Sequence, residues 1–399
     1  MVTALSSYLD SRVKADVGEG YDGIVRVAIG GYYGTGTLLY NGKAVLTAAH
    51  LFEGVSQSTV TVYFDTASGE ESIFGSYSVI ASYDSSDGNN DLALVWLDEN
   101  APVAAERYTL YRDSDEVSQN FTMVGYGAPG SGSYGVDENY SGEYLRLMTS
   151  NRFDADAAEL KALLGPTMAW NPTSQTQLLA DFDNGTSLRD ALGLFLGEYD
   201  SGRGVLEGLI APGDSGGPAF IDGKLAGVAS YTSSLETFAS HPDSDDSTNS
   251  TFGEIAAWQR VSYYQQWIDQ SMRAHYLDAP TLPSEVQKSV LEGDGGLSYA
   301  YFLVQFTGTR TEADDWVSVE YTTLSGTALA GVDFIATSGE LILYPDENYA
   351  VIPVEIISDT VDELNETFSL EIYNPIGGSF GEGIVKLTAV RTIVDDDGF

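Results

Sequence analysis

Three short stretches of sequence decide the fold: LTAAH, which ends at His50; NDLAL, with Asp91 as its second residue; and GDSGGP, with Ser215 as its third. They place a base, an acid and a nucleophile along the chain. A serine hydroxyl becomes a good nucleophile only when an imidazole removes its proton, and the imidazole needs a carboxylate to fix its tautomer and stabilise its cation. The stretches therefore predict a catalytic triad.

The surroundings of the histidine and the aspartate support this prediction. The chain has three histidines, His50, His241 and His275, so a chance pairing of motifs is improbable. His50 follows an apolar stretch, and the apolar run 92–97 carries Asp91 into the interior at the head of a strand. Each residue has an alternative when it is taken singly: His50 as a buried structural histidine, and Asp91 as one solvated carboxylate among 59 acidic residues.

GDSGGP also fits the Gly-x-Ser-x-Gly turn of the α/β-hydrolases, in which a helix follows the serine and the histidine comes last. Here residues 218–221 and 225–229 form two strand patterns around the turn Asp222-Gly223. This strand-turn-strand pattern disfavours the α/β-hydrolase alternative.

The order and the flanks of the three residues resemble those of the chymotrypsin-like serine proteases. The resemblance implies an all-β domain of two barrels with a short closing helix, predicted at 263–276. It also implies an oxyanion hole formed by the backbone N–H groups of Gly213 and Ser215. In many members of this family a cleaved N-terminal amine pairs with the aspartate that corresponds to Asp214, and the sequence leaves the partner of Asp214 open.

Specificity follows only through the same resemblance. The base of the substrate pocket falls near Leu209, its walls near Thr232 and Ala256, and Ser230 and Tyr231 line the cleft. A pocket for Arg or Lys needs a carboxylate at its base, because a buried unpaired cation is costly. Leu209 supplies none, which predicts a small or medium apolar P1 side chain.

An insertion at about 134–205 departs from the family pattern and holds two predicted helices, 155–164 and 187–196. Within it, DFDNG at 181–185 is typical of a cation-binding loop or of an Asx-rich turn before a helix. Both readings remain open.

A composition change after the closing helix marks a second domain. Two prolines stiffen a linker at 278–284, and residues 285–399 hold 21 acidic and 4 basic residues. Apolar residues alternate with polar ones at 317–321, 341–343, 351–356 and 368–372, which predicts a β-sandwich.

This tail resembles the Calx-β domain through VLEGD at 290–294, GTA at 326–328, GVDF at 331–334, ELNETF at 363–368 and DDD at 395–397. In that family the corresponding acids bind Ca²⁺, a hard cation that takes 6 to 8 oxygen ligands. The resemblance implies these calcium ligands: Glu292, Asp333, Asp359, Glu363, Glu366, Asp395, Asp396 and Asp397.

Composition bounds the remaining possibilities. A chain of 399 residues predicts two domains, 1–277 and 285–399, and zero cysteines exclude disulfides. A net charge of −41 makes nucleic acid an unexpected partner and suits a saline or calcium-rich setting. The sequence contains no run of 18 apolar residues and so predicts no membrane span, and residues 1–16 do not form a signal peptide pattern. The oligomeric state stays open.

Two hypotheses of different class follow. The first is a secreted, bacterial-type serine endopeptidase that cleaves protein or peptide substrates through an acyl-enzyme, with a calcium-binding module for stability or targeting. The second is a calcium-dependent adhesion or matrix protein whose protease-like domain is a noncatalytic scaffold. The complete catalytic motifs favour the first.

Overall fold

The computed structural model describes residues 1–197, 199–295, 298–310 and 315–397. The contacts divide the chain into two units: Met1–Leu39 with Lys43–Gln265, and Tyr40–Gly42 with Gln266–Phe399. The change from one unit to the other falls within helix α3 (Val261–Arg273).

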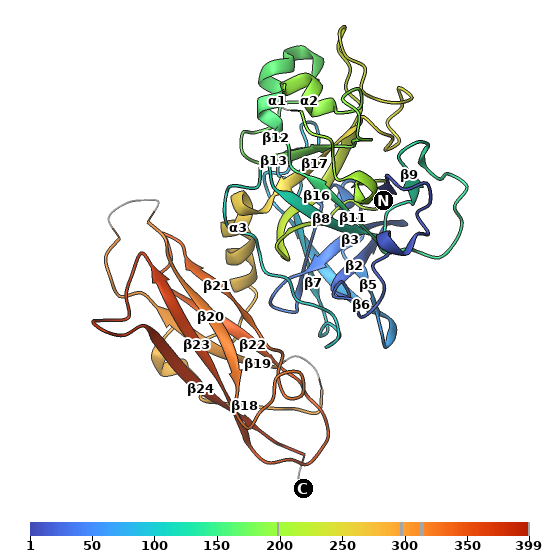
Figure 1. Cartoon of the computed structure of the whole chain (residues 1–399). Helices are drawn as coiled ribbons and strands as arrows, with labels where there is room; N and C mark the ends of the chain where they lie inside the picture. The colour runs from blue at the N-terminus through green and yellow to red at the C-terminus, as the bar shows by residue number, and fades with distance from the viewer. Residues whose placement is uncertain (198, 296–297, 311–314, 398–399) are drawn as a thin grey trace. The chain divides into compact units, whose positions relative to one another are not determined.

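The first unit contains a closed six-stranded β-barrel (Figure 1). Alternating residues fill its interior; along β5, for example, Val60, Val62 and Phe64 are fully buried and the residues between them are half-buried. The strands close in the order β2 (Ile24–Ile29), β3 (Tyr32–Leu38), β4 (Ala44–Thr47), β7 (Ala93–Leu97), β6 (Gly69–Val79) and β5 (Val60–Thr66).

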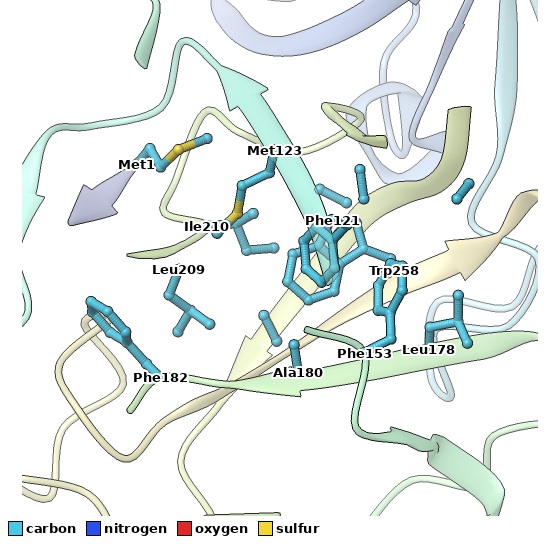
Figure 2. Packing of buried hydrophobic residues seen from close by; sticks show 14 of the residues in the cluster. Met1, Phe121, Met123, Phe153, Leu178, Ala180, Phe182, Leu209, Ile210 and Trp258 are labelled. Carbon is cyan, nitrogen blue, oxygen red and sulfur yellow. The ribbon is translucent and has the colours of Figure 1, made fainter. Parts of the chain in front are cut away.

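A seven-stranded sheet forms the other half of the two-barrel domain that the sequence predicts. Its core is aromatic: the Phe121 and Phe153 rings stack with centroids 4.1 Å apart, and Trp258 meets Phe121 edge-on at 5.0 Å (Figure 2). The strand order is β11 (Leu147–Arg152), β8 (Asn120–Gly125), β15 (Pro218–Ile221), β16 (Lys224–Ser233), β17 (Ile255–Arg260), β13 (Gln177–Asp181) and β12 (Ala155–Asp156).

The N-terminal residues join a small sheet in the same unit. Strand β1 (Val2–Thr3) lies between β14 (Gly208–Leu209) and β9 (Gly130–Ser131), and β10 (Gly135–Val136) completes the sheet. Val2 faces Leu209 across the antiparallel pair, and Met1 is only 1% exposed. The start of the described chain is therefore part of the core (Figure 2).

The helices of the insertion begin later than predicted. Helix α1 (Ala157–Leu164) starts after Asp156, whose side chain accepts from the N–H of Ala158. Helix α2 (Ala191–Leu196) starts after Asp190, which caps it in the same way. Short 3-10 helices lie at Ser11–Val13, Ala49–Phe52, Gly165–Thr167, Gly204–Leu206 and Pro283–Glu285.

The second unit is a β-sandwich. Its core includes Phe334 and Phe368, whose rings stack with centroids 4.5 Å apart. One sheet has the order β18 (Ser289–Leu291), β24 (Lys386–Val394), β23 (Glu366–Ile376), β20 (Val317–Ser325) and β21 (Ser338–Leu343), and the other pairs β19 (Ser298–Gln305) with β22 (Tyr349–Ile356).

Among the described residues of the chain, no helix has the length and apolar character to cross a membrane.

Candidate active site

The fold brings His50 and Asp91 into direct contact. His50 lies just after β4 and Asp91 just before β7, and these two strands are antiparallel neighbours, so the end of one lies beside the start of the other. Asp91 Oδ2 lies 2.7 Å from Nδ1 of His50, and Asp91 Oδ1 accepts the backbone N–H of His50 at 2.8 Å. Two bonds from one buried carboxylate thus fix both the imidazole and its backbone.

The environment makes His50 a stronger base than a free imidazole. Burial lowers the pKa of His50, but the hydrogen bond to Asp91 and the charge of Asp91 outweigh burial, so the pKa lies above its ordinary value of 6.5. In the neutral form, an Nδ1–H donated to Asp91 leaves Nε2 with a lone pair. That nitrogen is then able to accept a proton.

Ser230 supports Asp91 from strand β16. Its hydroxyl donates to Asp91 Oδ2 at 2.5 Å, and Gln259 Nε2 lies 3.4 Å from the same hydroxyl oxygen. Ser230 is 7% exposed and Asp91 is 2% exposed, so this carboxylate is held by donors inside the protein.

The segment that carries Ser215 is fixed on three sides. The carbonyl of Ser215 accepts from the N–H of Thr35 in β3, and the N–H of Gly216 donates to the carbonyl of Ala229, each at 2.8 Å. Gly216 has φ +81°, and a Cβ there would lie 2.0 Å from the hydroxyl oxygen of Thr47, at the end of the strand before His50. Only glycine fits there.

The backbone around Ser215 therefore lies beside Thr47, three residues before His50, and beside Ala229, directly before Ser230. Among the described residues, the Ser215 hydroxyl makes no hydrogen bond to His50 in this arrangement. Hydrogen bonds between catalytic groups are often long before substrate binds.

Gly213 adopts a conformation that favours glycine. Its φ is +96°, its carbonyl accepts from the hydroxyl of Thr35 at 2.8 Å, and a Cβ would approach the ring of Tyr33 to 2.9 Å. The backbone from Gly213 to Ser215 is thus held in one turn against β3.

The α-amino group of Met1 is the partner of Asp214. The amine lies 2.8 Å from Asp214 Oδ2 and donates to the carbonyl of Ala128 at 2.7 Å. Asp214 also accepts from the N–H groups of Gly127 at 2.8 Å and Ala211 at 2.9 Å. Met1 and Asp214 are each 1% exposed, so this ion pair is fully buried beside Ser215. The sequence left this partner open.

A hollow of about 420 Å³ adjoins His50 and Asp91. Three of the predicted substrate-binding residues line it: Ser230, Tyr231 and Thr232. The rest of its lining is acidic, aromatic or small: Glu53, Tyr83, Ser85, Ser86, Asp87, Gly88, Trp170 and Ser233.

The other two predicted pocket residues lie elsewhere. Leu209 and Ala256 are both fully buried in the hydrophobic cluster that also contains Met1 and Phe182 (Figure 2), and neither lines the hollow beside His50.

The C-terminal unit gathers acidic residues around Glu292. Carboxylate oxygens of Asp333, Glu363 and Glu366 lie within 4.8 Å of one another. Burial raises the pKa of Glu292 to about 7, and the charges of Asp359, Glu363, Asp395 and Asp333 add to that rise. Like charges at this density disfavour one another's ionised form.

The last predicted ligands belong to the same neighbourhood. Asp396 accepts from the N–H of Gly293 at 2.9 Å. A hydrogen bond with Asp294 raises the pKa of Asp397 to about 6. Gly293 and Asp294 directly follow Glu292, so all eight acids predicted from the sequence come to one region of the sandwich.

Two family models match the chain: the trypsin family over residues 14–169 and the Calx-beta domain over residues 285–397. The chain joins a trypsin domain to a Calx-beta domain. The trypsin match contains His50 and Asp91 and ends before Ser215. The resemblances drawn from the sequence motifs and the predicted all-β fold are confirmed at this level.

The chain is similar to parts of longer proteins. A stretch of it is 36% identical over 91 residues to the sodium/calcium exchanger Calx of Drosophila melanogaster, covering 22% of this chain and 9% of that protein. A stretch of 83 residues is 32% identical to adhesion G-protein coupled receptor V1 of Danio rerio, covering 21% of this chain and 1% of the receptor. The chain therefore spans only a small part of these relatives.

Among solved structures, mouse neuropsin, a serine protease, aligns with 65% of this chain and 98% of its own. The sequence identity is 17% and the TM-score is 0.47.

Two features of the trypsin domain were not predicted from the sequence. One is the contact of the Met1 amine with Asp214, which joins residues 213 positions apart. The other is the bond from Ser230 to Asp91, since Ser230 was predicted only to line the cleft. The spacing of Ser230 after Ser215 carries no signal about which way its hydroxyl points.

Proposed function

We propose that the trypsin domain is a serine endopeptidase that uses His50, Asp91 and Ser215. The observation that carries this proposal is the 2.7 Å contact between Nδ1 of His50 and the buried Asp91, beside the fixed backbone of Ser215. Acyl transfer by a serine requires a histidine base held by a carboxylate, with the nucleophile beside it.

The reaction proceeds in two halves. The Ser215 hydroxyl attacks the peptide carbonyl while Nε2 of His50 takes its proton, and Asp91 stabilises the imidazolium. The N–H groups of Gly213 and Ser215 bind the oxyanion. His50 then protonates the leaving amine, which leaves an acyl-enzyme on Ser215. Water, deprotonated by His50, attacks the ester and releases the acid.

We also propose a preference for a small or medium apolar P1 side chain. Leu209, at the predicted base of the pocket, is apolar and fully buried, so it offers no carboxylate to a basic P1 residue. Thr232, one of the predicted walls, lines the hollow beside His50 and takes up room there, whereas Ala256, the other predicted wall, is buried outside that hollow. A library of peptides that varies at P1 tests this: preferred cleavage after Lys or Arg would contradict it.

Labelling with a fluorophosphonate tests the catalytic role of Ser215. The full chain is expected to react with the probe, and Ser215→Ala is expected not to. Ser233→Ala is the matched control, since Ser233 lines the same hollow on strand β16. If the full chain is folded but fails to react both with and without Ca²⁺, the noncatalytic scaffold replaces this proposal.

The Calx-beta domain is proposed to bind Ca²⁺ through the acidic group around Glu292. Carboxylate oxygens of Asp333, Glu363 and Glu366 that lie within 4.8 Å of one another suit a hard cation with 6 to 8 oxygen ligands. The ion neutralises charges that otherwise repel, so its first effect is on the stability of this domain. Because the stability of this domain is proposed to depend on calcium, and because a net charge of −41 needs cations to screen it, we propose that the protein acts outside the cell.

Calorimetry with and without EDTA tests the calcium proposal. Ca²⁺ is expected to raise the melting temperature of the Calx-beta domain in the full chain, and Asp333→Asn is expected to reduce that rise. Glu320→Gln, an exposed acid on β20 of the same domain, is the matched control. Equal melting temperatures with Ca²⁺ and with EDTA would refute calcium binding here.

A further inference from the structure

A second group of acidic side chains lies inside the trypsin domain, in the insertion. We call Asp181, Asp183 and Asp190 the insertion cluster. Asp181 ends strand β13, Asp183 follows two residues later, and Asp190 caps helix α2. One carboxylate oxygen from each lies within 4.8 Å of the other two, and each residue is only 3% exposed. None of them lines the hollow beside His50.

Backbone groups hold two of the three carboxylates in place. Asp181 Oδ2 accepts from the N–H of Leu192 and Asp190 Oδ1 accepts from the N–H of Gly193, each at 2.6 Å. A neighbouring acid, Glu207, is 1% exposed and accepts from the N–H of Asp183 at 2.7 Å. The acids are therefore positioned by the fold and not free on its surface.

Asp183 provides the independent observation that points to a ligand. Its Oδ1 is buried and accepts no hydrogen bond from the described residues. A buried acceptor without a partner costs about 1–3 kcal/mol, and more when it is charged. Asp181 and Asp190 lie beside Asp183, and Glu207 accepts the N–H of Asp183 itself. The groups around this carboxylate are thus mainly other carboxylates.

We propose that the insertion cluster binds a calcium ion through Asp181, Asp183 and Asp190, with Glu207 beside it. Every donor is an oxygen, which suits a hard cation. Two oxygens on one Ca²⁺, at about 2.3–2.6 Å each, lie at most about 5 Å apart, so the spacing within the cluster fits one ion. The ion satisfies Oδ1 of Asp183 and offsets the repulsion among the acids.

The position of the cluster says what the ion stabilises. Asn151 Nδ2 donates to the carbonyls of Asp181 at 2.8 Å and Gly208 at 2.9 Å, and the N–H of Ala4 donates to the carbonyl of Glu207 at 2.8 Å. Gly208 begins strand β14, which pairs with β1. Calcium at the cluster therefore stabilises the segment that leads into β14, the antiparallel partner of β1.

Equilibrium dialysis with ⁴⁵Ca²⁺ on the full chain tests the proposal, and it must be separated from binding to the Calx-beta domain. A background variant replaces all eight acids proposed as calcium ligands in the Calx-beta domain with amides. This variant is expected to retain one bound Ca²⁺ per chain, and adding Asp183→Asn is expected to lower that affinity by roughly tenfold or more. Asp156→Asn is the matched control, since both oxygens of that buried acid already accept N–H groups.

Thermal unfolding of the trypsin domain gives a second readout, because the effect of Asp183→Asn on the melting temperature is expected to differ in sign between EDTA and Ca²⁺. In EDTA, Asp183→Asn is expected to melt at the same or a higher temperature than the parent chain, because the amide stays neutral among the neighbouring acids. In Ca²⁺ it is expected to melt lower. If the background variant binds no Ca²⁺, and Asp183→Asn stabilises the domain equally in Ca²⁺ and in EDTA, the cluster is a group of protonated acids and the proposal is overturned.

Discussion

Adding one glycine before Met1 tests how much the serine segment depends on its buried ion pair. The added residue moves the charged amine by up to about 3.8 Å along the chain and leaves a neutral peptide N–H in its former place. In the present structure that amine lies 2.8 Å from Asp214, and both groups are 1% exposed. The extension therefore leaves a buried carboxylate without its cation.

The size of the effect follows from that burial. Removing one partner of a buried ion pair costs about 3–5 kcal/mol. At about 1.36 kcal/mol per factor of ten, this corresponds to a fall of roughly 10²- to 10⁴-fold in the population that keeps Gly213 and Ser215 in their present turn. If the whole cost appears as stability, the trypsin domain melts roughly 6–20 °C lower.

Two measurements separate the outcomes. Active-site titration with a fluorophosphonate reports the fraction of molecules with a competent Ser215, and calorimetry reports stability without reference to activity. Asp214→Asn supplies the control, since an amide needs no cation. In that background the glycine extension is expected to change the reactive fraction by less than about threefold and the stability by less than about 1 kcal/mol. The reasoning is refuted if the extension lowers the reactive fraction and the stability as much in the Asp214→Asn background as in the parent chain. It is also refuted if, in the parent chain, the extension lowers the reactive fraction by less than about tenfold and the stability by less than about 1 kcal/mol.

Three further predictions concern the triad and calcium. Burial lowers the pKa of His50, but the hydrogen bond to Asp91 and the charge of Asp91 together outweigh it, so activity is expected to reach half its maximum above pH 6.5. In Asp91→Asn the midpoint of a pH–rate profile is expected to shift down and kcat to fall by about 10⁴-fold, and an unshifted midpoint would contradict this. Ser230→Ala removes one donor to Asp91 and is expected to lower kcat by roughly tenfold with little change in KM, measured by steady-state kinetics; a change confined to KM would make Ser230 a substrate contact only. For Glu292 the folded pKa of about 7 lies above its ordinary value of 4.5, so in EDTA the folded state holds more protons between these values and stability falls as pH rises across them; melting curves from pH 4.5 to 8 should show this fall in EDTA and a smaller one in Ca²⁺.

Local sequence patterns predicted the strands well because burial on one face imposes alternation. The runs predicted at 317–321 and 368–372 lie within β20 (Val317–Ser325) and β23 (Glu366–Ile376). The two helices predicted in the insertion began two to four residues early, because Asp156 and Asp190 act as caps and a capping residue lies outside the helix. Asp is among the preferred capping residues, so this signal was present in the sequence. The closing helix predicted at 263–276 instead spans Val261–Arg273.

Contacts between distant residues were harder to predict. The motifs around His50 and Asp91 predicted a pairing that the structure shows as a 2.7 Å contact. No periodicity connects Met1 to Asp214, because their meeting depends on β1 entering the small sheet with β14. Whether an acidic loop meets other acids likewise depends on the fold; the motif at 181–185 is part of a buried cluster because Asp190, the N-cap of α2, lies beside it.

The absence of cysteine gives these buried charges a structural meaning. Where a disulfide would tie two loops, this trypsin domain uses polar side chains that bind several carbonyls at once. Arg146, 7% exposed, donates to the carbonyls of Ala15 at 3.0 Å and Asp16 at 3.2 Å and pairs with Asp22 at 2.6 Å. A buried ion pair adds little net stability because desolvation offsets its attraction, yet removal of one partner is strongly destabilising. Such pairs therefore select one arrangement of the loops, and the serine segment depends on one of them.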